Sequence, residues 1–165
     1  MATIRNIIDA KQPTTEIDLI GPRVEFLIPP NCCTLSVMRS VFPAGVVVPL
    51  HSHADVEAFY TTAGQLQIFS ENANDWIAVK SNEFVYIPGN EKHAWRNVSD
   101  EDATMLLITT AKMGSFFEEI GVTISGEGQP LAPSPERLQH FIKAGIRYGY
   151  WLGSREENAA IGIAY

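Results

Sequence analysis

Between residues 24 and 110 the chain consists of short apolar runs separated by turn residues, and this rhythm limits the folds open to it. The turn clusters are rich in Pro, Gly, Asn, Asp and Ser. Short strands with turn signals at regular spacing predict an all-β sandwich or barrel. No helical periodicity of useful length occurs in this region. The expected strands are 24–28, 35–42, 57–62, 65–70, 76–79, 84–87, 94–98 and 103–110.

From residue 113 onward the pattern predicts helices instead of strands. Ser115 and Glu118 fit a capping box that opens a short helix, and Gly121 is its expected end. Ser134 and Pro135 fit the N-cap and first residue of a second helix. The apolar face of this second helix is expected to comprise Leu138, Phe141, Ile142 and Ile146.

The length of 165 residues is that of one compact domain. We expect a single domain over residues 1–165, with a β-barrel core at about 24–110 and a helical C-terminal extension at about 113–165. The second helix is expected to end at Gly149. Because the extension is too short to form a domain of its own, we expect its helices to pack outside the barrel or across its mouth.

Charge and apolar content exclude several classes of protein. Lys and Arg number 12 against 19 Asp and Glu, which gives a net charge of −7, so we expect no nucleic-acid partner and no membrane partner. The longest apolar stretches, 44–50 and 105–108, are far too short to span a bilayer. The first twenty residues contain no continuous apolar segment of the secretory kind. We therefore expect a soluble, cytoplasmic protein.

The cysteine content of the chain is one adjacent pair, Cys32 and Cys33. Neighbouring cysteines rarely form a disulfide, because the bond strains the peptide between them. We expect two reduced thiols, one packed inward and one pointing outward. Neither has the helix end or the basic neighbours that activate a thiol.

Histidines gather in the predicted β region. His51 and His53 point the same way if they share a strand, and Glu57 keeps the same parity. His93 comes from a different segment and joins them only through the tertiary fold. Three imidazoles and a carboxylate suit Fe, Ni, Mn, Cu, Co or Zn and not the all-oxygen sites of Ca and Mg. Taken alone, His51 and His53 are more typical of a metal-free surface pair than of a metal site.

Residues 45–64 carry glycines, histidines and a glutamate at defined spacings. Gly45 is followed by five residues, His51-x-His53, three residues, Glu57, six residues and Gly64. This segment resembles the first signature motif of the cupin superfamily and matches it at every fixed position.

Residues 82–97 are similar to the second cupin motif, with two departures. Pro88, His93 and Asn97 stand in place, but Asn82 and Asn90 replace two expected glycines. Asn is the non-glycine residue that best tolerates a left-handed backbone. We therefore expect both turns and all ligands to be retained.

The resemblance implies a fold, a cofactor and an assembly. The fold would be the cupin conserved β-barrel, a double-stranded jelly roll. One divalent transition metal per chain would be bound by His51, His53, Glu57 and His93. Glu57 would either stay on the metal or act as a catalytic base. Single-domain cupins are commonly homodimers, and the strand expected at 24–28 could complete the partner's sheet.

Strand parity also suggests which residues line the metal cavity. Trp95 and Asn97 share the parity of His93, and Phe59 shares that of Glu57. These side chains would give the cavity an aromatic wall. Ordinary barrel core is the alternative for Phe59 and Trp95.

The C-terminal extension is similar to that of quercetin 2,3-dioxygenase-like single-domain cupins. This likeness favours a metal-dependent dioxygenase that oxidises a small aromatic or apolar enolisable compound with O₂. Two alternatives stay open: a non-oxidative Lewis-acid enzyme (isomerase, cyclase or lyase) and a small-ligand binding protein without turnover. Fold likeness alone does not separate these classes.

Overall fold

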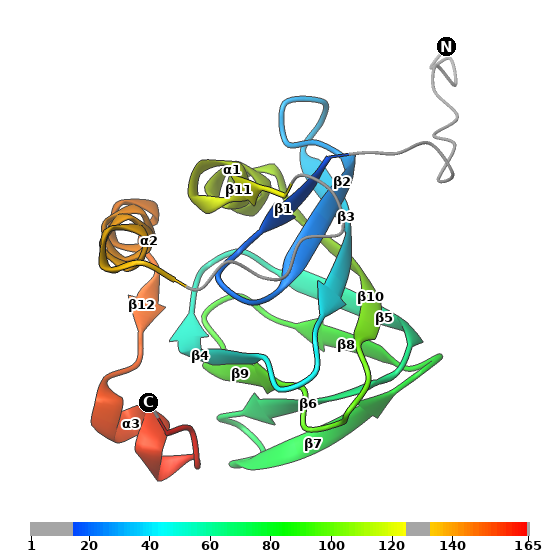
Figure 1. Cartoon of the computed structure of the whole chain (residues 1–165), viewed down its shortest axis with the longest axis vertical. Helices are drawn as coiled ribbons and strands as arrows, with labels where there is room; N and C mark the ends of the chain where they lie inside the picture. The colour runs from blue at the N-terminus through cyan, green and yellow to red at the C-terminus, as the bar shows by residue number, and fades with distance from the viewer. Residues whose placement is uncertain (1–14, 125–132, 165) are drawn as a thin grey trace.

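The computed structural model describes residues 15–124 and 133–164, and within them two antiparallel sheets face each other and close into a barrel (Figure 1). The larger sheet has the strand order β11 (Val122–Thr123), β1 (Glu16–Asp18), β2 (Arg23–Ile28), β3 (Leu35–Phe42), β10 (Ala103–Thr110), β5 (Glu57–Ala63), β8 (Phe84–Ile87). The smaller has the order β12 (Trp151–Leu152), β4 (Val47–Ser52), β9 (His93–Arg96), β6 (Gln65–Ser70), β7 (Asp75–Lys80). The expected all-β jelly-roll architecture is confirmed.

Strict alternation along the strands builds the core. In β3, Met38 and Phe42 are buried while their neighbours are half-buried, and β10 buries Met105 and Leu107 in the same way. Because successive side chains of a strand point to opposite faces, the buried set from both sheets meets inside the barrel. Trp95 of β9 joins this core from the opposite sheet.

Most predicted strands are confirmed, and 35–42, 65–70, 84–87 and 103–110 have the predicted bounds. The strand β4 was missing from the prediction. Pro49 lies within it and cannot donate to a ladder, and the register between β4 and β9 shifts between Val48 and His51. A strand tolerates proline at such an irregularity. The strands β1, β11 and β12 are too short to show a period.

The predicted left-handed turns are also confirmed. Asn82 and Asn90 have φ angles of 69° and 68°. Gly64 has a φ of 73°, and a Cβ atom on it would lie 2.7 Å from the backbone oxygen of Asp102. Gly64 is therefore required by close approach as well as by its backbone angle.

The first helix, α1 (Ala111–Ile120), begins earlier than predicted. Ser115 lies inside it, so the capping box assigned to Ser115 and Glu118 is wrong. Thr110 ends β10 and is itself the N-cap, because its side chain accepts a bond from the Met113 nitrogen. Strand and helix thus meet without a loop, and the helix ends before Gly121 as predicted.

The second helix, α2 (Pro135–Tyr148), has the predicted N-cap Ser134 and ends at a left-handed Gly149. Its predicted apolar face is wrong in part: Leu138, Ile142 and Ile146 are 41%, 46% and 69% exposed, whereas Ala144 and Gly145 are buried. A helix packs through the stripe that faces its neighbours, and here that stripe runs through Ala144 and Gly145.

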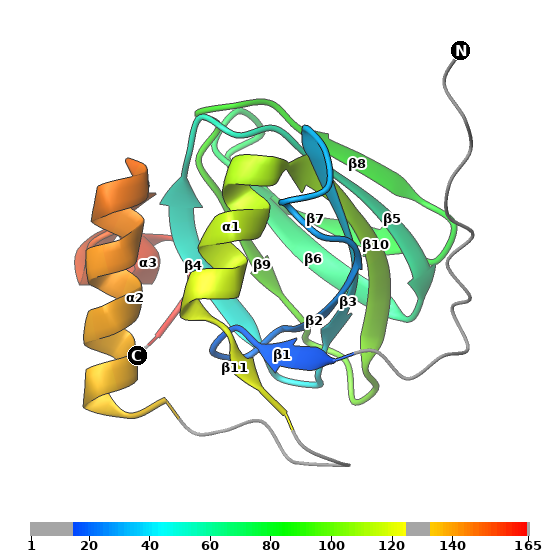
Figure 2. The same cartoon turned by 90° about the horizontal axis from the view of Figure 1, so that it is seen from above.

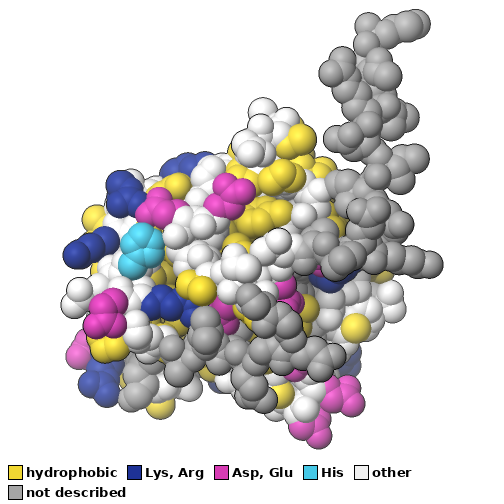
Figure 3. All heavy atoms as spheres, turned by 45° about the horizontal axis from the view of Figure 1, so that its top comes forward, with side chains coloured by type: hydrophobic (Ala, Val, Ile, Leu, Met, Phe, Trp, Pro, Cys, Tyr) yellow, Lys and Arg dark blue, Asp and Glu magenta, His cyan; other side chains and the backbone are white. Residues whose placement is uncertain are grey.

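The two helices lie side by side at one flank of the barrel (Figure 2), as part of the expected C-terminal extension. Glu119 of α1 pairs with Arg147 of α2, and His140 Nε2 lies 3.1 Å from the Glu119 carbonyl oxygen. The face in Figure 3 carries acidic and basic side chains side by side, interspersed with apolar ones. A short helix, α3 (Arg155–Ala160), follows β12.

Two smaller expectations change with the structure. Cys32 and Cys33 are both exposed, so neither thiol packs inward, because the segment between β2 and β3 projects from the sheet.

The strand β2 pairs with β1 on one side and with β3 on the other. It therefore has no free edge with which to complete a partner's sheet, and the homodimer itself stays a prediction.

Within residues 15–124 and 133–164, no helix is both long enough and apolar enough to cross a membrane.

Candidate metal centre

The histidines of the two motifs converge inside the barrel. His51 lies near the end of β4, His53 directly follows that strand, and His93 opens β9. The register places His51 opposite His93, with ring centroids 4.2 Å apart. One ligand atom from each of the three imidazoles lies within 4.8 Å of the others. The local pattern of β4 and the long-range pairing of β4 with β9 together create this cluster.

Backbone carbonyls orient all three imidazole rings in the same way. Each Nδ1 lies within hydrogen-bond distance of the carbonyl oxygen two residues away: His51 with Pro49 at 2.7 Å, His53 with Asp55 at 2.9 Å and His93 with Glu91 at 2.8 Å. Because a carbonyl only accepts, each Nδ1 carries the hydrogen. Each neutral ring then has a free lone pair on Nε2, the arrangement of a metal-binding histidine.

Glu57 opens β5 and brings a carboxylate to the same point. Its Oε2 atom lies 3.4 Å from His53 Nε2 and 3.1 Å from His93 Nε2, and its side chain is 5% exposed. None of these three buried atoms has a hydrogen-bond partner among the residues that the structure describes. Lone pairs facing an anionic oxygen repel one another unless a cation lies between them. The donor set therefore fits a divalent transition metal.

The electrostatics of the site favour the ligand forms of His51 and Glu57, whereas in the absence of a metal they favour the protonated form of His53. Burial, reinforced by His93, lowers the pKa of His51 to about 3, so this ring is neutral at physiological pH. Burial by itself would raise the pKa of Glu57, but His53 and His93 outweigh it and hold that pKa well below its usual range. Burial would likewise lower the pKa of His53, yet Glu57 outweighs it and raises that pKa.

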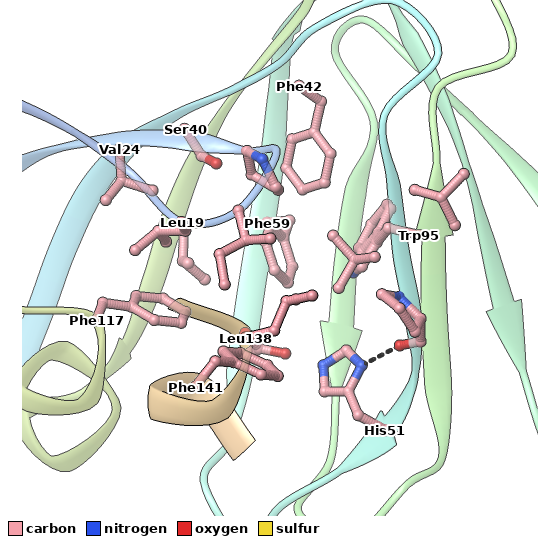
Figure 4. Close-up of a pocket in the computed structure, with 17 residues that line it drawn as sticks. Leu19, Val24, Ser40, Phe42, His51, Phe59, Trp95, Phe117, Leu138 and Phe141 are labelled. Atoms are coloured by element: carbon pink, nitrogen blue, oxygen red, sulfur yellow. Dashed lines mark hydrogen bonds between the residues drawn. The ribbon is translucent and has the colours of Figure 1, made fainter. Parts of the chain in front are cut away.

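An apolar cavity of about 180 Å³ adjoins the centre (Figure 4). His51 and Glu57 lie on its wall, and Phe59 and Trp95 line it with ring centroids 4.9 Å apart. The remaining wall comes from the barrel, from the connection between β1 and β2, and from both long helices, through residues that include Val24, Leu19, Phe117, Leu138 and Phe141.

Asn97, which strand parity assigned to the cavity, has another role. The strand β9 ends at Arg96, so the alternation that holds for His93 and Trp95 does not continue to Asn97. The Asn97 amide nitrogen donates to the carbonyl oxygens of Phe42 and Glu101, and its side-chain oxygen accepts from Ser99. Asn97 therefore ties together the loop that follows β9.

Sequence reasoning missed several residues around the site. Phe117, Leu138 and Phe141 reach the cavity from the helices, and the only signal for them was the apolar pattern of the extension. Asp55 and Tyr150 are buried next to His53, yet no local pattern pairs them. Contacts between distant segments decide both placements.

Comparisons with known proteins agree with this architecture. Residues 38–109 match the family model described as "Cupin domain". No curated protein sequence matches the chain.

Among solved structures, a predicted oxalate decarboxylase from Thermotoga maritima is 16% identical to this chain, with a TM-score of 0.57. The match covers 64% of this chain and 98% of the other chain. A Cupin 2 conserved barrel domain protein from Salinispora arenicola is 21% identical with a TM-score of 0.54, covering 70% and 98%. A cupin-superfamily sugar phosphate isomerase from Silicibacter pomeroyi is 17% identical with a TM-score of 0.54, covering 64% and 75%. Identities this low show the fold alone. Residues 38–109 thus match the cupin domain model, and the barrel that contains them has the jelly-roll fold seen in cupin structures.

Proposed function

We propose that this protein is a metal-dependent cupin enzyme, a dioxygenase that oxidises a small aromatic or apolar enolisable compound. One observation carries the proposal: three imidazoles and a carboxylate converge beside an apolar cavity of about 180 Å³, with His51 and Glu57 on its wall. A ligand cluster that opens onto such a cavity is typical of a catalytic site, whereas a structural zinc site is closed by protein ligands.

His51, His53, His93 and Glu57 would bind one divalent transition metal. Borderline nitrogen and oxygen donors suit Fe, Ni, Mn, Cu, Co or Zn. When bound, such a metal supplies Lewis acidity and, where it is redox-active, electron transfer to O₂. The carbonyl bonds to Nδ1 hold the rings in place before binding, so little reorganisation is needed.

The cavity wall supports an uncharged, planar substrate. Phe59 and Trp95 offer aromatic faces close to Glu57, and Phe117 and Phe141 add apolar surface from the helices. These side chains would orient a flat compound and exclude bulk water. Glu57 lies on the cavity wall, so its carboxylate is the candidate acceptor for the proton of a substrate hydroxyl.

The residues that line the cavity make sugar phosphates and oxalate unfavourable substrates, although the names of two fold neighbours suggest them. The names of the structural neighbours include a sugar phosphate isomerase and a predicted oxalate decarboxylase. No lysine or arginine is among the described residues that line this cavity. Burying a phosphate or dicarboxylate without a cationic partner is costly, so we favour a neutral or weakly acidic substrate.

Oxygen consumption tests the proposal directly. The purified protein is stripped with a chelator, reloaded separately with Fe, Ni, Mn, Cu, Co or Zn, and mixed with flavonols, catechols and β-diketones in an oxygen electrode. We expect O₂ uptake only when a redox-active metal and a substrate are both present. Anaerobic conversion of a substrate with no uptake would instead indicate a Lewis-acid isomerase or lyase, and binding without turnover would indicate a ligand-binding protein.

A further inference from the structure

Asp55 lies in the sequence between the proposed metal ligands His53 and Glu57. Its backbone oxygen and its carboxylate both make contacts. It is 6% exposed and sits in the loop from His53 to Glu57. Its backbone oxygen is the atom that lies 2.9 Å from His53 Nδ1. The position of the Asp55 carbonyl therefore sets the orientation of the His53 ring.

The Asp55 carboxylate is held from outside this loop. Thr110, the N-cap of α1, donates its hydroxyl to Oδ1, and Tyr150 donates its hydroxyl to Oδ2 at 3.1 Å. Lys112 Nζ lies 3.9 Å from Oδ2. Two hydrogen bonds and an ion pair thus restrain a residue whose own backbone restrains His53.

Tyr150 comes from the C-terminal extension, 95 residues away from Asp55 in the chain. It is 8% exposed, and its ring lies 5.1 Å from that of His53 and 4.7 Å from that of Phe116, measured between centroids. Burial, followed by the charge of Asp55, raises the pKa of Tyr150, so the hydroxyl keeps its proton and remains a donor.

We infer that Tyr150 is a positioning residue for the metal ligand His53, and that it acts through the carboxylate and backbone carbonyl of Asp55. The inference rests on the proposed metal centre. It gives the C-terminal extension, which lies outside the cupin domain at residues 38–109, a direct role in metal affinity.

The C-terminal extension also contacts β4, the strand that carries His51, the other histidine of the first motif. The strand β12 pairs with β4, with Leu152 opposite His51. Asn158 accepts a bond from the Leu50 nitrogen at 2.8 Å, and Gly153 donates to the Leu50 oxygen at 2.8 Å. Docking of the extension and metal binding therefore stabilise each other, because coupling between two sites is reciprocal.

The test compares Tyr150→Phe with Tyr148→Phe in the full chain. Both changes remove one hydroxyl and keep an aromatic ring in the same cluster around Phe116, but only Tyr150 bonds to Asp55. Dissociation constants for Co²⁺ are measured by competition with a chromophoric chelator, and the visible absorption of bound Co²⁺ reports the ligand geometry.

We expect about tenfold weaker Co²⁺ binding and an altered Co²⁺ spectrum in Tyr150→Phe, since outer partners of metal ligands typically contribute about 10–100-fold. Tyr148→Phe should bind Co²⁺ as the unmodified chain does. Equal affinity and spectrum in all three proteins would overturn the inference and leave the metal centre intact. Equal weakening in both variants would overturn it too, by pointing to packing. A parent chain that binds no Co²⁺ would overturn the metal centre and the inference together.

A second variant keeps the test decisive if Tyr150→Phe does not fold. Asp55→Asn preserves the backbone carbonyl and the size of the side chain while removing the charge that Tyr150 and Thr110 bind. It should weaken Co²⁺ binding to a similar degree and alter the same spectrum. Addition of Co²⁺ should also slow amide hydrogen exchange in β12 of the parent chain, and the absence of such protection would contradict the coupling.

Discussion

His51 and His93 face each other across β4 and β9, with ring centroids 4.2 Å apart, although 42 positions separate them in the chain (93 − 51). A register shift at Pro49 lets β4 bring His51 opposite His93. One ring nitrogen of each, together with one of His53, forms the cluster on which the metal proposal depends.

Replacing His93 should remove the metal and leave the fold. His93→Ala deletes one of four proposed ligands. Loss of a residue that only hydrogen-bonds to a ligand typically weakens metal binding about 10–100-fold, and we expect a larger loss here. Metal content per chain, measured by inductively coupled plasma mass spectrometry, checks this result. His140→Ala is the control, because His140 is half exposed on α2 and remote from the ligand cluster. Full occupancy in His93→Ala would exclude His93 as a ligand.

Metal removal should lower thermal stability, because a ligand that binds only the folded state stabilises it. At a free metal concentration of 100 times Kd, the gain is about 2.7 kcal/mol. For a chain of this length, that corresponds to a Tm decrease of roughly 5–10 °C on chelation. Differential scanning calorimetry with and without chelator measures the shift. The same treatment should leave the Tm of His93→Ala unchanged, and an equal shift in that variant would place the bound metal elsewhere.

Glu57→Gln should cut turnover while leaving the barrel folded. Glutamine keeps the shape of Glu57 but removes the negative charge that faces His53 and His93. If Glu57 accepts a substrate proton, the loss should be roughly 10²–10⁴-fold in kcat. Oxygen uptake gives the rate, and metal content measured in parallel separates the two roles. A slow enzyme with full metal content identifies a base, and loss of the metal identifies a ligand.

Two glycine-to-alanine changes should have opposite effects. A Cβ atom on Gly89 would lie 2.4 Å from the Ala54 oxygen, in the segment that carries His53. Gly89→Ala should therefore destabilise the fold by roughly 1–3 kcal/mol and weaken metal binding, since backbone must move. Gly145 lies within α2, and its nearest neighbour would be 3.8 Å away. Gly145→Ala should stabilise by about 0.5–1 kcal/mol. Urea denaturation measures both, and a neutral Gly89→Ala would contradict the predicted clash.

Phe59 should contribute to stability as well as to the cavity wall. It is 3% exposed and packs on Trp95, so Phe59→Ala should cost about 3–5 kcal/mol. Phe84 of β8 is 60% exposed and lies opposite Tyr60 of β5, and Phe84→Ala should change stability by no more than about 0.5 kcal/mol. Equal losses in the two variants, measured by urea denaturation, would show that burial does not govern these positions.

Much of the barrel could be predicted because its determinants are local. Alternation in β3 and β10 and the turn residues between strands each act over a few neighbouring positions. The left-handed angles at Asn82 and Asn90 follow from the conformational tolerance of asparagine. The spacing of His51, His53 and Glu57 is likewise visible within a few positions, but these residues do not share one strand, and the fold brings their side chains together.

The amino-acid sequence by itself therefore determined the all-β class and the turns, and its resemblance to cupins supplied the jelly roll and the residues of the proposed metal site. The tertiary structure decided the rest: that Asn97 ties a loop, that Ile142 and Ile146 face outward, and that Tyr150 reaches Asp55. Each of these depends on which distant surface a segment packs against. Parity and periodicity describe one element at a time, whereas a contact across the fold follows from the packing of all elements together.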